Sequence, residues 1–446
     1  MNTRSTALTS TINVSTNRKN QRIIRERKDC IFTIDFLYMK SFNVPVIYRS
    51  PLISAIKQKR KQDDKKKKDF TPTLLDFGSL QIFLARHFGF CYGVENAIEI
   101  AFRTVEENTG KRIFLLSEMI HNPFVNEDLI GRGVRFMMDT KGNQLVPFEE
   151  LTPEDVVIIP AFGTTLDIES KLRNTGIQVE NYDTTCPFVE KVWNRSEQIA
   201  VKGYSVIVHG KPSHEETRAT FSHSAAHTPT VVVNDMEEAV ELGRYITGEK
   251  PADEFYVAFR YRHTPGFDVN RDLGRIGVVN QTTMLASDTQ AIADYLKQLI
   301  KEHYKLDETS IGERFADTRD TLCYATLDNQ SAVTGILEQP ADLAIVVGGR
   351  NSSNTSHLVE LCEEKLPTHF IRSAEDLISA TDLCDFNWRT KEEKMLQHYL
   401  PAKQPARILI TSGASCPDAM VEGVIKRLLE FYPDARNYDD ICKIWE

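Results

Sequence analysis

Short apolar runs alternate with segments of helical periodicity from Leu80 to about residue 432, and this alternation favours a fold built from α/β units. Amphipathic stretches such as 94–105 and 419–429 lie between or after the runs. We expect largely parallel sheets, with ligands bound at the carboxyl ends of the strands. The predicted strands are residues 80–85, 113–116, 156–159, 205–209, 275–279, 343–347 and 407–410.

Three cysteines share one local context, a polar loop directly before a helix-like segment. They occur in Gly89-Phe-Cys91-Tyr-Gly-Val, Thr184-Thr-Cys186-Pro-Phe-Val and Asp320-Thr-Leu-Cys323-Tyr-Ala. A helix N-terminus favours a thiolate over a thiol, and thiolates are the usual ligands of a [4Fe–4S] cluster. Three protein ligands leave the fourth iron open to substrate. The alternative is three unrelated buried cysteines that behave as small hydrophobic residues.

The other five cysteines lack this context. Cys362 lies in a helix-like run, Cys384 and Cys442 lie in irregular or terminal regions, and Cys30 belongs to an atypical N-terminal segment. Cys416, in a glycine-containing loop, is the one rival ligand, and we interpret it as packing beside a binding loop.

The spacing of the three cysteines predicts three pseudo-symmetric α/β lobes around a central iron–sulfur cluster. We expect an extension over residues 1–79, partly disordered, and a strand and loop over 80–92 that join the third lobe. The lobes themselves are expected at 93–186, 187–320 and 321–446, with the polar stretch 245–273 expanding the second.

Composition excludes several classes of protein. The net charge of −9 argues against general nucleic-acid binding, and no apolar run approaches the roughly 18 residues of a membrane helix. Eight cysteines without a CxxC pair favour a reducing compartment over a disulfide scaffold or a zinc ribbon. We therefore expect a soluble, cytoplasmic protein.

Two N-terminal segments carry open alternatives. Residues 1–38 are either a transit peptide for a plastid-type organelle or an upstream extension of a chain that starts at Met39. The basic run 57–68 is either a solvated linker or an attachment site for nucleic acid or membrane, and we favour the linker.

Four loops of small polar residues follow predicted strands. They cover residues 209–217, 280–283, 348–354 and 411–416, and such loops offer N–H and hydroxyl donors to phosphate oxygens. His121 and His214 are candidate diphosphate ligands, with a structural hydrogen-bonding role as the alternative. Glu216 is a proton donor if a low-dielectric site raises its pKa, and otherwise a surface carboxylate beside Glu215. No Walker A or GxGxxG motif is present.

Taken together, the motifs GFCYGV, IHNPFVN, DTTCPFV, SHEET, NQTTM, NSSNTSHL and SGASCPD closely resemble the LytB/IspH family of 4-hydroxy-3-methylbut-2-enyl diphosphate reductases. They occur in the same order as in the family, between about Leu80 and residue 432. Their residues resemble those of the longer plant and cyanobacterial branch. The resemblance implies a [4Fe–4S] cluster on Cys91, Cys186 and Cys323, with Glu216 as the proton source. It also implies a substrate site formed by His121, His214, Thr282, Ser352, Ser353, Asn354 and Ser415.

The activity that the resemblance implies is the last step of the non-mevalonate isoprenoid pathway. The allylic hydroxyl is removed reductively, giving isopentenyl and dimethylallyl diphosphate. Because no nicotinamide or flavin motif is visible, we expect ferredoxin or flavodoxin to donate the electrons. Two alternatives are a dehydratase similar to quinolinate synthase and a non-catalytic iron–sulfur or anion-binding module.

One position departs from the pattern of many bacterial members. They carry Ala-His-Gly where this chain has Ala161-Phe162-Gly163, as the plant and cyanobacterial branch does. Phe162 is therefore expected to remove one hydrogen-bond donor to the diphosphate.

Overall fold

The computed structural model describes residues 42–66, 68–316 and 321–445. The chain separates into two units, Met1–Asn43 and Val44–Glu446. The predictions for residues 1–38, for a start at Met39 and for Asp320 lie outside the described residues. The account below concerns the second unit.

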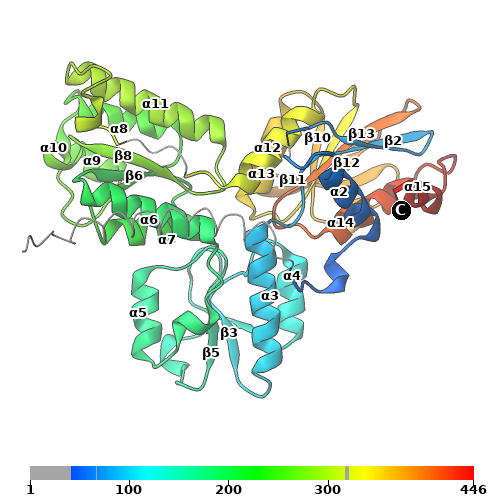
Figure 1. Ribbon diagram of the computed structural model, residues 1–446, viewed down its shortest axis with the longest axis horizontal. Coiled ribbons are helices and arrows are strands. Elements are labelled where there is room, and N and C mark those ends of the chain that lie inside the picture. The colour runs from blue at the N-terminus through cyan, green and yellow to red at the C-terminus, as the bar shows by residue number, and fades with distance from the viewer. Residues whose placement is uncertain (1–41, 67, 317–320, 446) are drawn as a thin grey trace, which may run out of the picture. The chain divides into compact units, whose positions relative to one another are not determined.

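Three α/β lobes, each built on its own sheet, make up most of this unit (Figure 1). The first lobe has a parallel sheet in the order β4-β3-β5, with β3 at Ile113–Leu115, β4 at Arg135–Phe136 and β5 at Val156–Ile158. Its helices are α3 (Tyr92–Glu107), α4 (Pro123–Gly131) and α5 (Leu166–Asn174).

The second lobe has a parallel sheet in the order β7-β6-β8. Its strands are β6 (Ser205–His209), β7 (Thr230–Val233) and β8 (Ile276–Asn280). Its helices are α6 (Pro187–Val201), α7 (Glu215–Ala225), α8 (Met236–Ile246), α9 (Ala252–Ala258), α10 (Val269–Asp272) and α11 (Ala286–His303). Residues 245–273 cover the end of α8, the helices α9 and α10 and their connections, and Phe255, Phe259 and Phe267 anchor this stretch in the core of the lobe.

The third lobe has a five-stranded sheet in the order β1-β2-β13-β9-β10, parallel except for β1. A separate hairpin pairs β11 with β12. The strands are β1 (Thr73–Asp76), β2 (Leu80–Leu84), β9 (Leu343–Val347), β10 (Thr368–Ile371), β11 (Asp382–Asn387), β12 (Glu392–Gln397) and β13 (Ala406–Ser412). The helices are α2 (Pro51–Asp63), α12 (Tyr324–Ile336), α13 (Ser353–Glu363), α14 (Asp418–Glu430) and α15 (Tyr438–Trp445).

All seven predicted strands are present; two have the predicted ends, and the other five have ends that differ by one or two residues. Strands β6, β8 and β9 are buried at every position, which is why their sequences are nearly continuous apolar runs rather than alternating ones. None of the helices among the described residues is long and apolar enough to cross a membrane.

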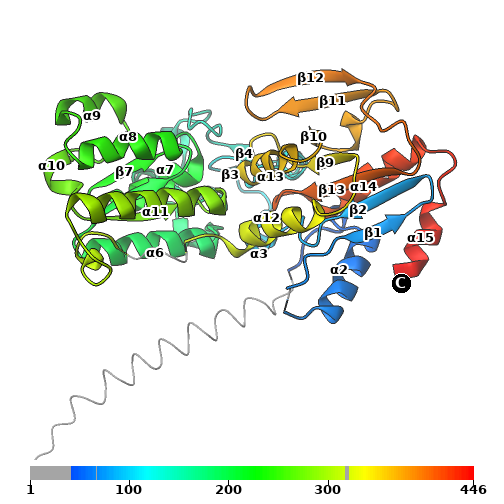
Figure 2. The ribbon, with the colours of Figure 1, turned by 90° about the horizontal axis from the view of Figure 1, so that it is seen from above.

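Two expectations about the local structure are wrong. The basic run is not simply a linker, because residues 57–63 form the second half of α2, which buries Leu52, Ile53 and Ile56. Figure 2 shows α2 beside β1 and close to α15. Cys384 lies in strand β11 rather than in an irregular region.

Candidate active site

The three cysteines occupy equivalent positions, each as the N-cap of a helix. Cys91 precedes α3, Cys186 precedes α6 and Cys323 precedes α12, and Pro187 fills the first helical position after Cys186. All three line one cavity with about 660 Å³ of empty space, part of which is open to solvent.

A glycine allows two of these cysteines to approach each other. A Cβ atom on Gly93, in the first turn of α3, would lie 2.4 Å from Cys186 Sγ. Any side chain at this position would collide with the sulfur. The first turn of α3 therefore requires a glycine where it contacts Cys186. The first lobe thereby brings both Cys91 and Cys186 to the same cavity.

Burial governs the ionisation of these thiols. It raises the pKa of Cys91 to about 12 and also raises the pKa values of Cys186 and Cys323. The N–H groups of the first helical turns act in the opposite direction at all three sulfurs. Each sulfur is therefore a protonated thiol that a bound metal centre would deprotonate.

The donor set fits an iron–sulfur cluster better than a single ion. Among the described residues, no group of three or more His, Cys, Asp or Glu side chains converges on one ion-sized site. A cluster requires no such convergence, because each thiolate binds a different iron. Three helix-capping sulfurs around a cavity walled in part by Val94, Val189 and Ala325 are suited to that cofactor.

Cys416 does not line this cavity. Its side chain is fully buried in the core of the third lobe, and its sulfur lies 3.6 Å from the Pro417 carbonyl oxygen.

The polar residues singled out in the sequence line the same cavity as the cysteines. They come from all three lobes and comprise His121, His214, Glu216, Thr282, Ser352, Ser353, Asn354 and Ser415. His214 and Glu216 lie at the start of α7, after β6, and Thr282 follows β8. The parallel strands of three sheets thus direct their polar loops to one place, as expected for α/β folds.

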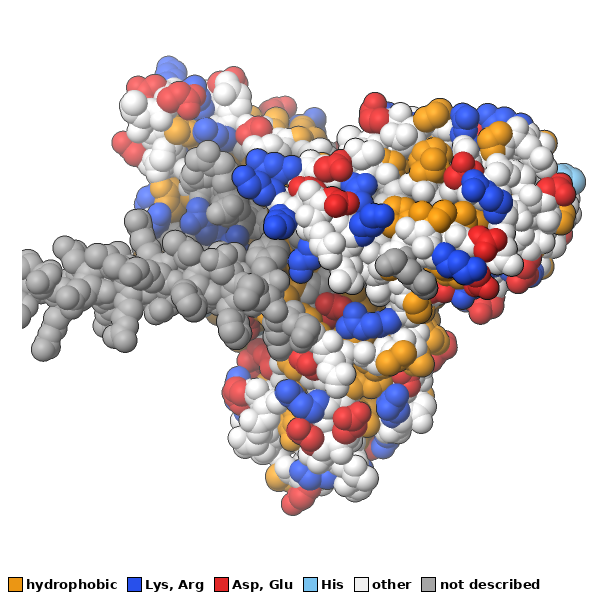
Figure 3. Space-filling model, turned by 45° about the vertical axis from the view of Figure 1, so that its right-hand side comes forward, with side chains coloured by type: hydrophobic (Ala, Val, Ile, Leu, Met, Phe, Trp, Pro, Cys, Tyr) orange, Lys and Arg blue, Asp and Glu red, His pale blue; other side chains and the backbone are white. Residues whose placement is uncertain are grey.

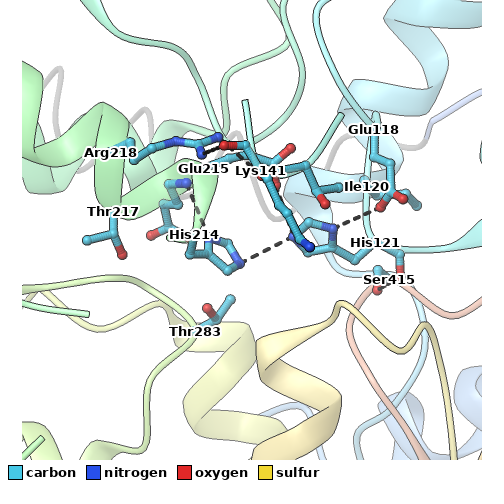
Figure 4. Close-up of polar contacts among 12 residues, drawn as sticks. Glu118, Ile120, His121, Lys141, His214, Glu215, Thr217, Arg218, Thr283 and Ser415 are labelled. Carbon is cyan, nitrogen blue, oxygen red and sulfur yellow. Dashed lines mark hydrogen bonds and ion pairs between the residues drawn. The ribbon is translucent and has the colours of Figure 1, made fainter. Parts of the chain in front are cut away.

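His121 and His214 both line the cavity, and their rings point toward each other (Figure 4). Their Nε2 atoms are 3.3 Å apart, and the two rings are nearly perpendicular. His121 Nδ1 lies 3.0 Å from Glu118 Oε2, and its Nε2 lies 3.4 Å from Glu215 Oε2.

The surroundings shift the pKa values of the two histidines in opposite directions. Burial works against charging His121, but the carboxylates of Glu118 and Glu215 outweigh it and raise the pKa of this imidazole. Burial lowers the pKa of His214 well below its ordinary value, and the nearby His121 and Lys211 lower it further.

His214 holds its proton on the nitrogen that faces His121. Its Nδ1 accepts a hydrogen bond from the Glu216 backbone N–H at 3.2 Å, so the neutral ring is protonated at Nε2. A charged His121 also carries a proton on Nε2. Two N–H donors then lie 3.3 Å apart, and an anion beside the pair would accept hydrogen bonds from both.

Glu216 is fully buried, and burial raises its pKa to about 7. Its Oε1 atom accepts a hydrogen bond from the Thr282 backbone N–H, which limits the rise. Near neutral pH this carboxyl group is therefore partly protonated inside the cavity, as a general acid requires.

The N-terminus of α13 supplies donors with no protein partner. Ser353 Oγ and Asn354 Nδ2 are buried and make no hydrogen bond to any of the described residues. Ser352 caps the helix by accepting a hydrogen bond from the Thr355 N–H. Unsatisfied buried donors are costly, so an anion at this 11-residue helix is the expected partner.

A second glycine sets the position of this loop. A Cβ atom on Gly349 would lie 1.9 Å from the His121 carbonyl oxygen. The same carbonyl accepts a hydrogen bond from Ser415 Oγ at 3.3 Å. The loops after β9 and β13 therefore both pack directly against the backbone of His121.

Phe162 also lines the cavity, where its ring stacks on His121 at a centroid distance of 4.3 Å. It meets His214 edge to face at 5.6 Å. The phenylalanine offers no hydrogen bond, but it packs against both histidines.

Other lining or contacting residues were not foreseen as functional. Thr283 and Thr326 line the cavity, and Glu118 and Glu215 contact His121. Thr283 and Glu215 adjoin predicted site residues, so adjacency was a usable signal for them. The position of Thr326, three residues after Cys323 on the helix that Cys323 caps, was a usable signal that it lines the site. Nothing in the local sequence distinguishes Glu118 from a surface carboxylate.

The family model that describes the LytB protein matches residues 82–429 of the chain. Among curated relatives, the 4-hydroxy-3-methylbut-2-enyl diphosphate reductase of Synechococcus sp. (strain RCC307) is 40% identical over 354 residues, which cover 79% of this chain and 84% of the relative. The reductase of the same name from Gloeobacter violaceus is 36% identical over 356 residues, covering 79% of this chain and 83% of the relative.

A solved structure shares the fold. The E-1-hydroxy-2-methyl-but-2-enyl-4-diphosphate reductase from Plasmodium falciparum superposes with a TM-score of 0.55 at 22% sequence identity. The match covers 77% of this chain and 86% of that one.

Proposed function

The chain belongs to the LytB protein family, as its motifs predict, and we propose that it reduces 4-hydroxy-3-methylbut-2-enyl diphosphate to isopentenyl and dimethylallyl diphosphate, the last step of the non-mevalonate pathway. The observation that carries this proposal is the convergence of three helix-capping cysteines, a partly protonated glutamate and unsatisfied anion donors on one cavity.

Cys91, Cys186 and Cys323 would hold a [4Fe–4S] cluster in that cavity. When bound, the cluster supplies a Lewis-acidic iron without a protein ligand and electrons that are delivered singly. The remaining contributions come from side chains that bind the substrate and move protons.

The diphosphate would bind where donors from three lobes converge, and two of these donors lack a partner among the described residues. His121 and His214 present N–H groups from one side, and Ser353 Oγ and Asn354 Nδ2 present donors from the N-terminus of α13. Ser352 and Ser415 complete this lining. A charged His121 beside a helix N-terminus favours a dianionic group over a neutral one.

Glu216 would protonate the departing hydroxyl group. Loss of hydroxide from carbon is slow, and a positioned acid that converts it into water contributes about 10²–10⁴ in rate. Thr282 holds the glutamate in place through its backbone N–H. The reaction balances as one substrate, two electrons and two protons giving one hydrocarbon diphosphate and one water.

The electrons would come from ferredoxin or flavodoxin, since the chain carries no nicotinamide or flavin motif.

The test is anaerobic turnover of the substrate by cluster-loaded protein with a reduced viologen. Wild type should consume the diphosphate, whereas the Glu216→Gln variant should bind substrate and keep its iron but lose most of its rate. A protein that only binds anions or clusters would be indifferent to this substitution, and a loaded wild type without turnover would refute the proposal.

A further inference from the structure

The helix α2 places a basic surface next to the loop that carries Cys91. Residues 57–69 include seven described Lys or Arg side chains and three Asp side chains. The whole chain has a net charge of −9, so this segment reverses the sign of the protein's average charge. Acidic and basic side chains are mostly interspersed on the face seen in Figure 3.

The inner part of the run is used to attach the helix. Lys57 Nζ contacts Asp418 Oδ1 at 2.7 Å and lies over the Phe88 ring at 4.7 Å. Arg60 pairs with Asp69 at 2.9 Å. These contacts fix the orientation of α2 on the third lobe.

The outer part of the run remains available. Lys61, Lys65, Lys66 and Lys68 are exposed, and none of them takes part in an ion pair among the described residues. Four unpaired lysines lie within eight consecutive residues that also hold Asp63 and Asp64, so this stretch keeps a net positive charge that attracts an acidic protein at moderate ionic strength. We call these four lysines the α2 lysine cluster.

Lys57, in the middle of α2, is close to one cluster ligand, and Lys61 of the α2 lysine cluster follows it by about one helical turn. A Cβ atom on Gly89 would lie 2.9 Å from Lys57 Nζ, and Gly89 is two residues before Cys91. Because consecutive Cα atoms are 3.8 Å apart, Lys57 Nζ lies within about 12 Å of Cys91 Cα. On the other side of the loop, the Tyr48 ring packs on Phe90, the neighbour of Cys91, at a centroid distance of 6.0 Å.

Electron transfer between proteins depends steeply on distance, so a donor has to dock near a cluster ligand. Complexes of this kind are weak, bury less than about 1,200 Å² and are guided by charge. Because the protein has a net charge of −9, a strongly acidic donor would be repelled by it on average and attracted by the basic run of α2.

We propose that the α2 lysine cluster is the docking surface for a small acidic ferredoxin that delivers electrons on the Cys91 side of the cavity. This inference rests on the proposed function. Each reduced ferredoxin gives up one electron and leaves oxidised, so two docking events serve each substrate that takes up two electrons and two protons.

The experiment compares charge-reversal variants with two electron donors. The test variant is K61E/K65E/K68E, and the control is K111E/K171E/K202E, which reverses three exposed lysines on the first and second lobes. Each cluster-loaded protein is assayed anaerobically with a reduced acidic [2Fe–2S] ferredoxin and with a reduced zwitterionic viologen. Binding of oxidised ferredoxin is measured separately by calorimetry.

We expect the test variant to lose about tenfold or more in kcat/KM for ferredoxin at low salt, with a matching loss in binding affinity. The difference from wild type should shrink as salt is added. Turnover with the viologen should be unchanged, and the control variant should resemble wild type with both donors. A neutral K61Q/K65Q/K68Q variant should give an intermediate loss.

Equal ferredoxin kinetics and binding for wild type and the test variant would overturn the docking surface while leaving the proposed reaction intact. The same holds if the control variant loses as much as the test variant. Failure of the reaction itself would appear differently, as absent turnover of wild type with the viologen.

Discussion

Burial of Glu216 makes the stability of the protein depend on pH in a defined way. The pKa of this carboxyl group rises from its ordinary value of 4.5 to about 7 in the folded protein, because the group is fully buried. At 1.36 kcal/mol per pKa unit, ionising it in the folded state costs about 3 kcal/mol. This stability is fully present below pH 4.5 and is lost as the pH rises through 7.

About 2 kcal/mol of that loss falls between pH 5.5 and pH 8.5. Urea unfolding of the cluster-free protein at these two values measures it directly. The Glu216→Gln variant cannot ionise, so wild type should lose about 2 kcal/mol relative to this variant over the interval. An exposed control, Glu149→Gln, should follow wild type.

Comparing each protein with itself at two pH values removes any constant cost of the substitution. Parallel pH profiles for wild type and Glu216→Gln would refute the argument, since they would mean that Glu216 has the same pKa folded and unfolded. In the cluster-loaded protein the same pKa predicts that the rate falls about tenfold per pH unit above 7.

Four further substitutions test other parts of the site and fold. Cys91→Ser should lower the iron content per chain on elemental analysis, whereas Cys416→Ser, outside the cavity, should not. Ser353→Ala removes a buried donor without a protein partner and should raise KM about tenfold with a smaller effect on kcat in steady-state assays. Gly349→Ala forces a Cβ atom against the His121 carbonyl and should lower the free energy of unfolding by about 1–3 kcal/mol. Tyr48→Phe loses a 2.7 Å hydrogen bond to Asp128, and urea unfolding should show a loss of about 1–2 kcal/mol.

The sequence pattern was sufficient to predict the fully buried strands and insufficient to predict the exposed or very short ones. Strands such as β6 and β9 are predictable because full burial demands continuous apolar residues. The β11–β12 hairpin carries Asp, Glu and Lys at many positions and is half exposed, so its pairing depends on tertiary context. Strand β4 has only two residues and no periodicity to detect.

The basic run shows how a charged composition can conceal a helix. Ser50 caps α2, Pro51 occupies its first position, and Leu52, Ile53 and Ile56 form its buried face. This start signal precedes the lysines, and the high charge of the segment masks it. The lysines cover the solvent side of a helix whose apolar side is short.

The candidate active site also has features that the sequence predicts and features that it does not. Side chains at strand ends and helix starts were predictable from loop composition, because α/β topology gathers such loops at one edge. The opposite charge preferences of His121 and His214 were not, because they depend on Glu118 and Glu215 and on the Glu216 N–H. The contact between His121 and Glu215 joins two lobes, so neither local sequence reveals it.

The most direct test of the proposed reaction counts electrons against product. Cluster-loaded protein with verified iron and sulfide content is mixed anaerobically with reduced viologen and 4-hydroxy-3-methylbut-2-enyl diphosphate. We predict two viologens oxidised per substrate consumed, with isopentenyl and dimethylallyl diphosphate as the products. Substrate loss without viologen oxidation would indicate a dehydratase, and no consumption by fully loaded protein would contradict the account altogether.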